Sequence, residues 1–224
     1  MNIALALLIV GVVSCGLPLD ASTLPAARWL VTAATVALFV LLGLRSSRVY
    51  LAAMLVCLVL AGLGEAMLSL VFGLYDYRGG GIPAFVPPGH VLLFALGSWI
   101  APRVPEDLGV RIAWVVLPAT AVLGLTGADP LSLVLVLLYL AAIRYGPAPR
   151  LYGVMFLLAL LLELWGTRIG TWAWRHQIPG LGWHTLNPPL AAGAFYCVLD
   201  WLVQVLTPRL AILAPAIAPQ DQRS

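Results

Sequence analysis

Apolar residues occur along the chain in long runs, separated by short stretches that contain glycine, proline and arginine. Eight runs are compatible with membrane-spanning helices, and several are shorter than the ~20 residues of a perpendicular span, so that tilt, re-entry or a locally thin bilayer would be needed there. They cover residues 3–19, 26–44, 49–73, 89–102, 110–126, 130–144, 151–173 and 188–207. Apolar and polar positions do not alternate as in a barrel strand, and backbone groups in lipid must pair within the protein. The pattern therefore predicts an all-α, polytopic transmembrane bundle of about eight helices.

Composition supports a lipid environment. Hydrophobic residues make up 62% of the chain and charged residues 9%, whereas a soluble domain carries roughly 25% charged residues. The mean hydropathy is +1.01. A net charge of +3 leaves no basic patch for nucleic acid, so we expect a membrane lipid or a hydrophobic small molecule as the partner.

The arginines predict an orientation. With eight helices and a cytoplasmic N-terminus, the inner side would carry eight arginines and the outer side four. The inner set is Arg45, Arg48, Arg103, Arg111, Arg144, Arg150, Arg209 and Arg223, and the outer set is Arg28, Arg78, Arg168 and Arg175. Because cytoplasmic loops are enriched in arginine, we expect a multi-pass protein of the bacterial cytoplasmic (inner) membrane with both termini inside. Residues 209–224 would form a short, poorly ordered cytoplasmic tail.

An ordered series of residue types occurs twice along the chain, offset by about 96 to 102 residues. The first copy reads Glu65, Ser69, Gly73, Tyr75, Tyr77, Arg78, Ile82, Pro83, Pro87, Pro88 and Trp99. The second reads Glu163, Thr167, Gly170, Trp172, Trp174, Arg175, Ile178, Pro179, Pro188, Pro189 and Trp201. The series predicts a single transmembrane domain, 1–208, made of two parallel four-helix repeats, about 1–104 and 105–208. Both copies of the series would then lie on the same side of the membrane.

Three carboxyl groups fall within the predicted spans: Glu65, Glu163 and Asp200. Each ionised acid would cost ~2.5–3.5 kcal/mol in a membrane, so each needs a partner, a proton or water. We take them as candidate catalytic acids or bases. The alternative is that they only join helices through hydrogen bonds. Asp200 differs from the other two, because the first repeat has no acid at the corresponding place.

On the run 151–173, spacings of three, four and seven residues place Glu163, Gly166, Thr167 and Gly170 on one helix face. The two glycines would let a helix or a ligand approach closely. Glu65 and Ser69 repeat the arrangement. A carboxyl group one turn from a hydroxyl group fits a proton relay, a cation ligand or a structural hydrogen bond, and the sequence leaves these open.

Two aromatic-basic segments follow the glutamates. Their candidate substrate-binding residues are Tyr75, Tyr77, Arg78, Trp172, Trp174, Arg175 and His176. One interpretation is an interfacial belt of aromatic rings with arginines reaching to the headgroups. The other is a lined mouth in which Arg78 and Arg175 hold an anionic headgroup or neutralise Glu65 and Glu163.

Cofactor motifs are lacking in the sequence. The three cysteines have neither zinc-ligand nor redox spacing, and the sequence contains no nucleotide-binding fingerprint. His90, His176 and His184 are too few for a histidine-rich metal site, although near the outer side a neutral imidazole could transfer protons. We therefore expect no metal and no cofactor.

The stretch from Glu65 through Phe72-Gly73-Leu74-Tyr75-Asp76-Tyr77 resembles the Glu…Phe-Gly-x-Tyr-x-Tyr segment of carotenoid-biosynthesis membrane proteins of the bacterioruberin-type hydratase family. The resemblance covers about 35 residues, and the second half of the chain departs from that pattern. It implies addition of water to a polyene chain, or its removal, with Glu65 as the acid.

Three functional hypotheses follow. The first is a membrane-embedded enzyme or binding protein for an isoprenoid, carotenoid or other lipid near the outer leaflet, in which Arg78, Arg175 and His176 orient a polar end. The second is a small proton- or cation-coupled transporter, whose two acids would meet beside a path to both faces. The third is a membrane assembly or scaffold subunit, acting as a homo-oligomer or with a membrane-protein partner.

Overall fold

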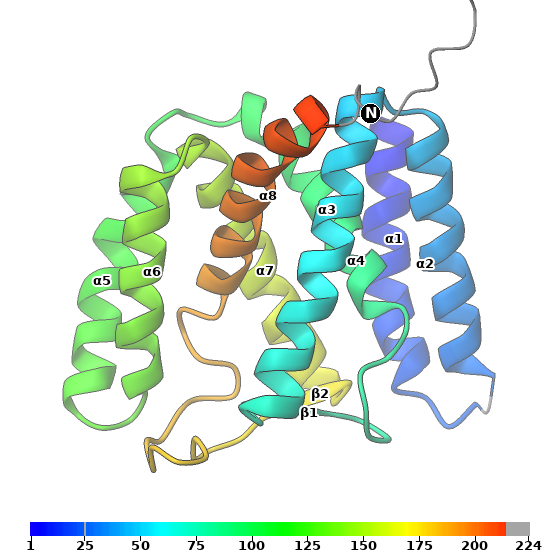
Figure 1. Cartoon of the computed structure of the whole chain (residues 1–224). Helices are drawn as coiled ribbons and strands as arrows, with labels where there is room; N and C mark the ends of the chain where they lie inside the picture. The colour runs from blue at the N-terminus through cyan, green and yellow to red at the C-terminus, as the bar shows by residue number, and fades with distance from the viewer. Residues whose placement is uncertain (25, 214–224) are drawn as a thin grey trace, which may run out of the picture.

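The computed structural model describes the backbone of residues 1–24 and 26–213, and side chains up to residue 209. Eight α-helices occur in these residues, which confirms the predicted all-α bundle (Figure 1). They are α1 (Ile3–Asp20), α2 (Ala27–Leu44), α3 (Arg48–Glu65), α4 (Val86–Ile100), α5 (Leu108–Leu125), α6 (Pro130–Tyr145), α7 (Pro149–Ile169) and α8 (Gly193–Leu213). A π-helical segment, Ala66–Val71, extends α3, and a 3-10 turn, Ala101–Arg103, follows α4.

Five helices in the described part of the chain are long and apolar enough to cross a membrane: α1, α2, α3 with its π-helical extension, α5 and α7. The α4 and α6 helices have 15 and 16 residues, fewer than the ~20 of a perpendicular span. Large apolar side chains such as Trp114 and Leu125, 77% and 85% exposed, point outward from the bundle. In water this surface would be unfavourable, whereas in lipid it is the expected exterior.

The helices connect two faces of the bundle. The N-terminus and the end of α8 lie on one, which we call the N-terminal face; two short strands lie near the other, the strand face (Figure 1). The bounds of the elements place seven of the described arginines toward the N-terminal face and four toward the strand face. The two faces therefore carry unequal numbers of arginines, as the sequence predicts.

The order of elements is the same in the two halves. Three helices, a strand and a helix form α1-α2-α3-β1-α4, and the series recurs as α5-α6-α7-β2-α8. The strands β1 (Tyr75–Tyr77) and β2 (Trp172–Trp174) pair antiparallel, while α3 packs on α8 and α4 on α7. The contacts of α3 with α8 and of α4 with α7, together with the strand pair, join the two halves.

The sequence analysis does not predict the strands: β1 follows the expected run 49–73, and β2 overlaps the end of the expected run 151–173. The expected helices 49–73 and 151–173 end earlier, at Val71 and Ile169. Gly170 ends α7 in the left-handed conformation, with φ of +79°, and Gly73, with φ of +60°, follows the π-helical segment. Such backbone angles suit glycine because it has no Cβ atom. Each glycine therefore precedes a strand rather than continuing a helix.

The boundaries of α8 also differ from the expected run 188–207. The helix begins at Gly193, after a loop held by the buried carboxylate of Asp129, which accepts hydrogen bonds from the Thr185 hydroxyl at 2.8 Å and the Leu190 N–H at 3.0 Å. At the other end α8 continues to Leu213, so the start of the expected tail 209–224 is helical. Residues 214–224 of that tail lie outside the described residues.

Close packing of α5 on α7 supplies a test of the fold. A Cβ atom on Gly153 would lie 2.8 Å from the backbone nitrogen of Gly109, whereas one on Gly11 would meet no atom within 4 Å. We expect Gly153→Ala to destabilise the protein by about 1–3 kcal/mol, since the helices must separate. Gly11→Ala is the matched control and should leave the thermal midpoint in detergent unchanged or slightly higher. Equal midpoints for the two variants would contradict this packing.

Candidate functional site

Glu65 lies at the end of α3 and is 7% exposed. Its Oε2 atom accepts hydrogen bonds from the hydroxyls of Tyr75 at 2.8 Å and Tyr77 at 2.7 Å. Alternate residues of a strand project to the same side, so an aromatic-x-aromatic sequence presents both rings to one carboxyl group. The first repeat thus supplies both the acid and two of its hydrogen-bond donors.

Glu163 has an equivalent environment in the second repeat and is also 7% exposed. Its Oε2 atom accepts from the indole nitrogens of Trp172 at 2.8 Å and Trp174 at 2.9 Å. Gly166 makes room for the Trp172 ring, because a Cβ atom there would lie 2.0 Å from it. The donors differ in one important respect: a tyrosine hydroxyl both donates and accepts, whereas an indole N–H only donates.

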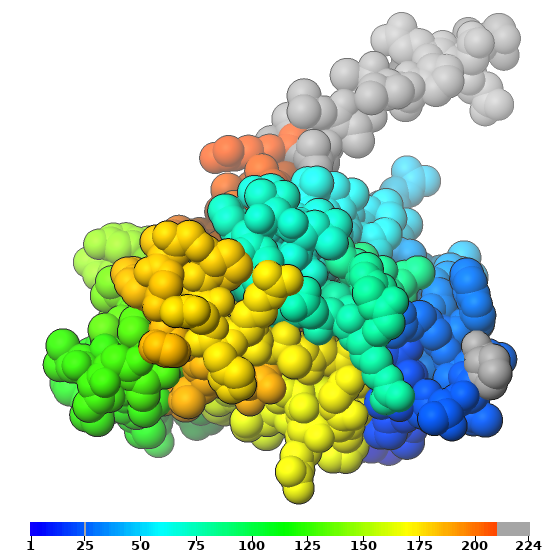
Figure 2. Space-filling model, turned by 90° about the horizontal axis from the view of Figure 1, so that it is seen from below, coloured from blue at the N-terminus to red at the C-terminus, as the bar shows by residue number. Residues whose placement is uncertain are grey.

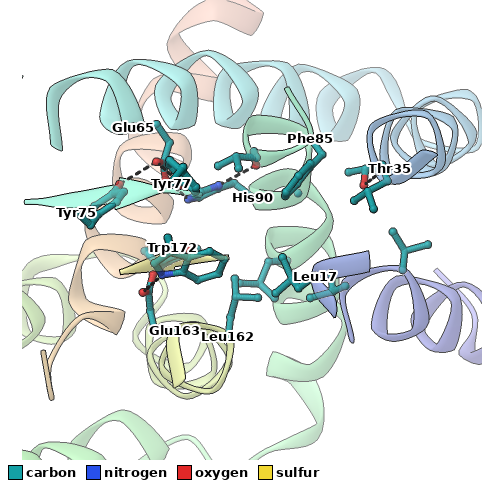
Figure 3. Close-up of a pocket in the computed structure, with 17 residues that line it drawn as sticks. Leu17, Thr35, Glu65, Tyr75, Tyr77, Phe85, His90, Leu162, Glu163 and Trp172 are labelled. Carbon is teal, nitrogen blue, oxygen red and sulfur yellow. Dashed lines mark hydrogen bonds and ion pairs between the residues drawn. The ribbon is translucent and has the colours of Figure 1, made fainter. Parts of the chain in front are cut away.

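Strand pairing brings these two environments together. The rings of Tyr75 and Trp174 are 4.8 Å apart between centroids, and those of Tyr77 and Trp172 are 6.1 Å apart. We call these four side chains the aromatic quartet. The close-up shows Glu65 and Glu163 approaching from opposite sides, on α3 and α7, with rings between them (Figure 3). The two acids therefore face a common space.

His90, on α4, adds a titratable group to this space. Its Nδ1 atom lies 3.0 Å from the Val86 carbonyl oxygen, and its Nε2 atom lies 3.4 Å from Oε1 of Glu65. A carbonyl oxygen only accepts, so Nδ1 carries a hydrogen and Nε2 faces the carboxyl group. A favourable contact at Nε2 then requires one proton, held either by the imidazole or by the carboxyl group. The His90 ring also stacks on Tyr196, with centroids 4.7 Å apart.

Two cavities meet at these side chains. Both are lined by Glu65, Tyr75, His90, Glu163 and Tyr196. The small cavity, about 60 Å³, extends between α1, α2 and α4. The lateral cavity, about 400 Å³, extends between α3, α6 and α8 along mainly apolar residues.

The lateral cavity reaches the outer surface of the bundle. Leu63, Met67 and Leu202 line it and are 59%, 45% and 44% exposed. These residues lie on the lipid-facing sides of α3, its π-helical extension and α8. An apolar molecule could therefore enter from the membrane without crossing water.

The arginines do not neutralise the glutamates, contrary to one interpretation of the sequence. Arg175 instead makes a two-pronged ion pair with Asp76, with N–O distances of 2.8 and 2.9 Å, which joins β2 to β1. Arg78 donates to the backbone oxygen of Ala21. His176 is exposed, and its backbone oxygen accepts from Thr185. These three predicted substrate-binding residues hold the strand face together and lie outside the residues that line the two cavities.

The suggested carboxyl–hydroxyl relays are not formed either. The Thr167 hydroxyl donates to the backbone oxygen of Glu163 at 2.7 Å, and the Ser69 hydroxyl donates to the backbone oxygen of Tyr75 at 3.2 Å. Hydroxyls on helices commonly bond to the carbonyl four residues earlier, as Thr167 does. The aromatic side chains replace these hydroxyls as partners of the carboxylates.

Asp200 stands apart from the other two acids. It is fully buried in α8, lies outside the lining of both cavities, and neither carboxyl oxygen has a hydrogen-bond partner among the described residues. Two residues that do line the site were not predicted to belong to it. For His90 the sequence indicates only a possible proton carrier, and Tyr196 carries no signal because it lies within an apolar run.

Within the described residues, no three His, Cys, Asp or Glu side chains lie together as a metal site would require. Comparison of the chain with protein-family models, curated proteins and solved structures finds no match.

The Asp76–Arg175 pair gives a pH-dependent test of the strand pairing. The guanidinium of Arg175 lowers the pKa of Asp76. Because the pKa of Asp76 is lower in the folded state, the ion pair contributes to the stability of the fold above the ordinary carboxyl pKa of about 3.9. This contribution is lost as the pH falls through the pKa of Asp76 in the folded state. We expect Arg175→Gln to lower the thermal midpoint slightly at pH 7, because both side chains are partly exposed, and to lower it less at pH 3.

Arg168→Gln, which changes another exposed arginine near the same face, is the control for Arg175→Gln. A midpoint difference between Arg175→Gln and the wild type that persists unchanged at pH 3 would show that the ion pair does not cause it.

The shared proton and the lateral cavity predict selective chemical modification. A hydrophobic carbodiimide reacts with protonated carboxyl groups in apolar surroundings. We expect it to label Glu65 or Glu163 at neutral pH, as read by peptide mass spectrometry. Asp129 is an internal control, because it is a buried acid that lines neither cavity. Labelling of Asp129 with neither glutamate modified would contradict the described site.

Proposed function

We propose that the protein is a membrane-embedded enzyme that adds water to a carbon–carbon double bond of an isoprenoid, carotenoid or other unsaturated lipid, or catalyses the reverse reaction. One observation carries the proposal: two intramembrane carboxyl groups, one beside an imidazole, line the same pair of cavities. Acid-base chemistry on an apolar substrate needs this combination of titratable groups and lipid access.

The lateral cavity would bind the hydrocarbon chain. Its lining is mainly apolar, and its opening lies where an acyl or isoprenoid chain can enter from the bilayer. Tyr75 and Trp174 of the aromatic quartet line it beside the acids. Flat rings of this kind pack against an extended polyene, and their faces stabilise positive charge.

The Glu65–His90 pair would act as the acid. It transfers its proton to one carbon of the double bond, which breaks the π bond and leaves a cation on the other carbon. Aromatic faces near the acids would stabilise this cation. The resemblance of the Glu65–Tyr77 segment to carotenoid hydratases supports the same assignment, because Glu65, Tyr75 and Tyr77 are the residues that meet here.

Glu163 would act as the base. A water needs ~10–15 Å³ of free space and polar partners. The small cavity, at about 60 Å³, has room for such a water beside Glu163. The water oxygen bonds to the cation and its proton passes to the Glu163 carboxylate, giving an alcohol. Return of that proton to the Glu65–His90 pair through the shared cavity resets the site.

For the orientation in the membrane, we propose that the arginine-rich N-terminal face is cytoplasmic in a bacterial inner membrane. Both termini would then be inside, and the acids would lie in the outer half of the bilayer. The substrate would accordingly be a lipid that reaches the outer leaflet.

A proton-coupled transporter is the second candidate. It is supported by the meeting of acids from two repeats at their interface, where coupled carriers bind their ions. The two functions differ in what moves. A carrier would transport protons together with a solute between faces, whereas the enzyme would change its lipid covalently.

The experiment is a hydration assay with the full chain in lipid nanodiscs, using ¹⁸O-labelled water and a series of carotenoids and isoprenoids. We expect labelled oxygen in the product with the wild type. Glu65→Gln and Glu163→Gln should lower the rate by about 10²-fold or more, the usual contribution of a positioned acid or base. Glu106→Gln is the matched control, because that side chain is 90% exposed on a loop of the N-terminal face.

Lipid extraction and mass spectrometry of the purified protein complete the test. A protein that carries no isoprenoid, incorporates no label and gives the same lipid profile in all variants would contradict the proposed enzyme. Proton influx into liposomes driven by a solute gradient, and lost in both Gln variants, would favour the transporter.

A further inference from the structure

A polar stripe runs along α8 through the middle of the bundle. Tyr196, Asp200 and Gln204 follow one another at spacings of four residues, which places them on one face of the helix. Polar side chains are costly at this depth and therefore require an explanation. The residues that line the two cavities include Tyr196 but neither Asp200 nor Gln204.

One end of the stripe lies at the acids. Tyr196 lines both the small and the lateral cavity and stacks on His90. His90 in turn faces the carboxyl group of Glu65. Tyr196 is therefore the member of the stripe that lies beside the Glu65–His90 pair.

The middle of the stripe is Asp200. It is 0% exposed, and in the part of the chain that the structure describes neither of its oxygens makes a hydrogen bond. A residue without a hydrogen bond does not join helices. An unpaired buried carboxylate is very costly, which favours the neutral, protonated form of the group. The titratable side chains near it are Tyr50 and Cys57 on α3, Tyr152 on α7, and Tyr196 and Cys197 on α8. None of these is a cation that would pair with Asp200.

The other end of the stripe lies in a cavity of about 410 Å³ near the N-terminal face. Gln204 lines it together with Tyr50 and Ser98. Tyr50 and Ser98 also line a neighbouring cavity of about 470 Å³, which contains Arg45 and Arg103 from the N-terminal face. Gln204, one helical turn from Asp200 on α8, thus lines a cavity near that face, beside apolar side chains such as Phe94 and Val203.

The strand face is covered by comparison. Figure 2 views this face and shows the segments that follow β1 and β2, in teal and yellow to orange, lying across the middle of the bundle. Ion pairs and hydrogen bonds of Arg28, Arg78 and Arg175 fasten this cover. The α8 stripe, by contrast, leads toward the N-terminal face, where Gln204 lines a cavity.

We propose that the α8 stripe is a proton path from the N-terminal face to the Glu65–His90 pair, with Asp200 as the intermediate carrier. Gln204 orients water at the entrance, and Asp200 accepts a proton as it releases its own. Tyr196, with intervening water, passes that proton to His90. The path carries protons only, so it requires no oxidant or co-substrate, and the protonation of the pair follows the pH at the N-terminal face.

The test measures hydrogen–deuterium exchange of protonated carboxyl groups by infrared spectroscopy. The full chain in lipid is switched from H₂O to D₂O, and the carbonyl bands are assigned with Glu65→Gln, Glu163→Gln and Asp200→Asn. We expect an Asp200 band in the wild type. We also expect exchange of the glutamate bands to slow by about tenfold or more in Asp200→Asn, because a carrier is lost. Gln204→Leu should slow it as well, and Val205→Leu, at the next position of α8, should not.

The proposal is overturned if the Asp200 band is absent in the wild type, or if the glutamate bands exchange at the wild-type rate in both Asp200→Asn and Gln204→Leu. Because Gln204 lies near the surface, Gln204→Leu remains informative if Asp200→Asn does not fold. No substrate is added, so the outcome is independent of whether the proposed hydration occurs.

Discussion

A carboxyl group within a membrane has to be matched by hydrogen-bond donors, by a proton or by water, because hydrocarbon offers none of these. In this protein the requirement is met twice by the same means. Each glutamate receives two hydrogen bonds from aromatic side chains that alternate along a three-residue strand. The strands in turn need each other, since their backbone groups would otherwise lack partners near the lipid. Pairing of β1 with β2 therefore stabilises both acids and fastens the two halves of the chain.

This constraint explains the form of the site. A helix that continued through Gly73 or Gly170 would carry the aromatic residues away from the glutamates. The left-handed glycines let the chain turn, and the strands then present their rings to the acids from the preceding helices. The arginines that follow the strands lie at the strand face, where Arg175 pairs with Asp76 and so joins β2 to β1. The aromatic quartet thus lies between the Asp76–Arg175 ion pair, which holds the strands together, and the two glutamates, which are the candidate catalytic groups.

The two halves are similar in architecture but differ in chemistry. Glu65 is surrounded by hydroxyls and an imidazole, groups that exchange protons, whereas Glu163 is bound by indole nitrogens that only donate. Asp200 is a further difference between the halves. It lies on α8, whereas the equivalent helix of the first half, α4, contains no acid. A duplicated fold can in this way supply an acid at one side of a cavity and a base at the other, as the proposed hydration requires.

The eight helices could be predicted from the sequence, because the cost of placing polar groups in lipid acts on each segment separately and leaves a local apolar pattern. The duplicated series could also be recognised, and with it the importance of Glu65, Glu163 and their aromatic neighbours. Only the tertiary structure decided what those residues touch. The pairing of Asp76 with Arg175 joins residues 99 positions apart, and His90 and Tyr196 come from two further helices. The lack of a partner for Asp200 likewise follows from the packing of several helices. Hydropathy is a property of each segment, whereas hydrogen-bond partners depend on how segments distant in sequence meet.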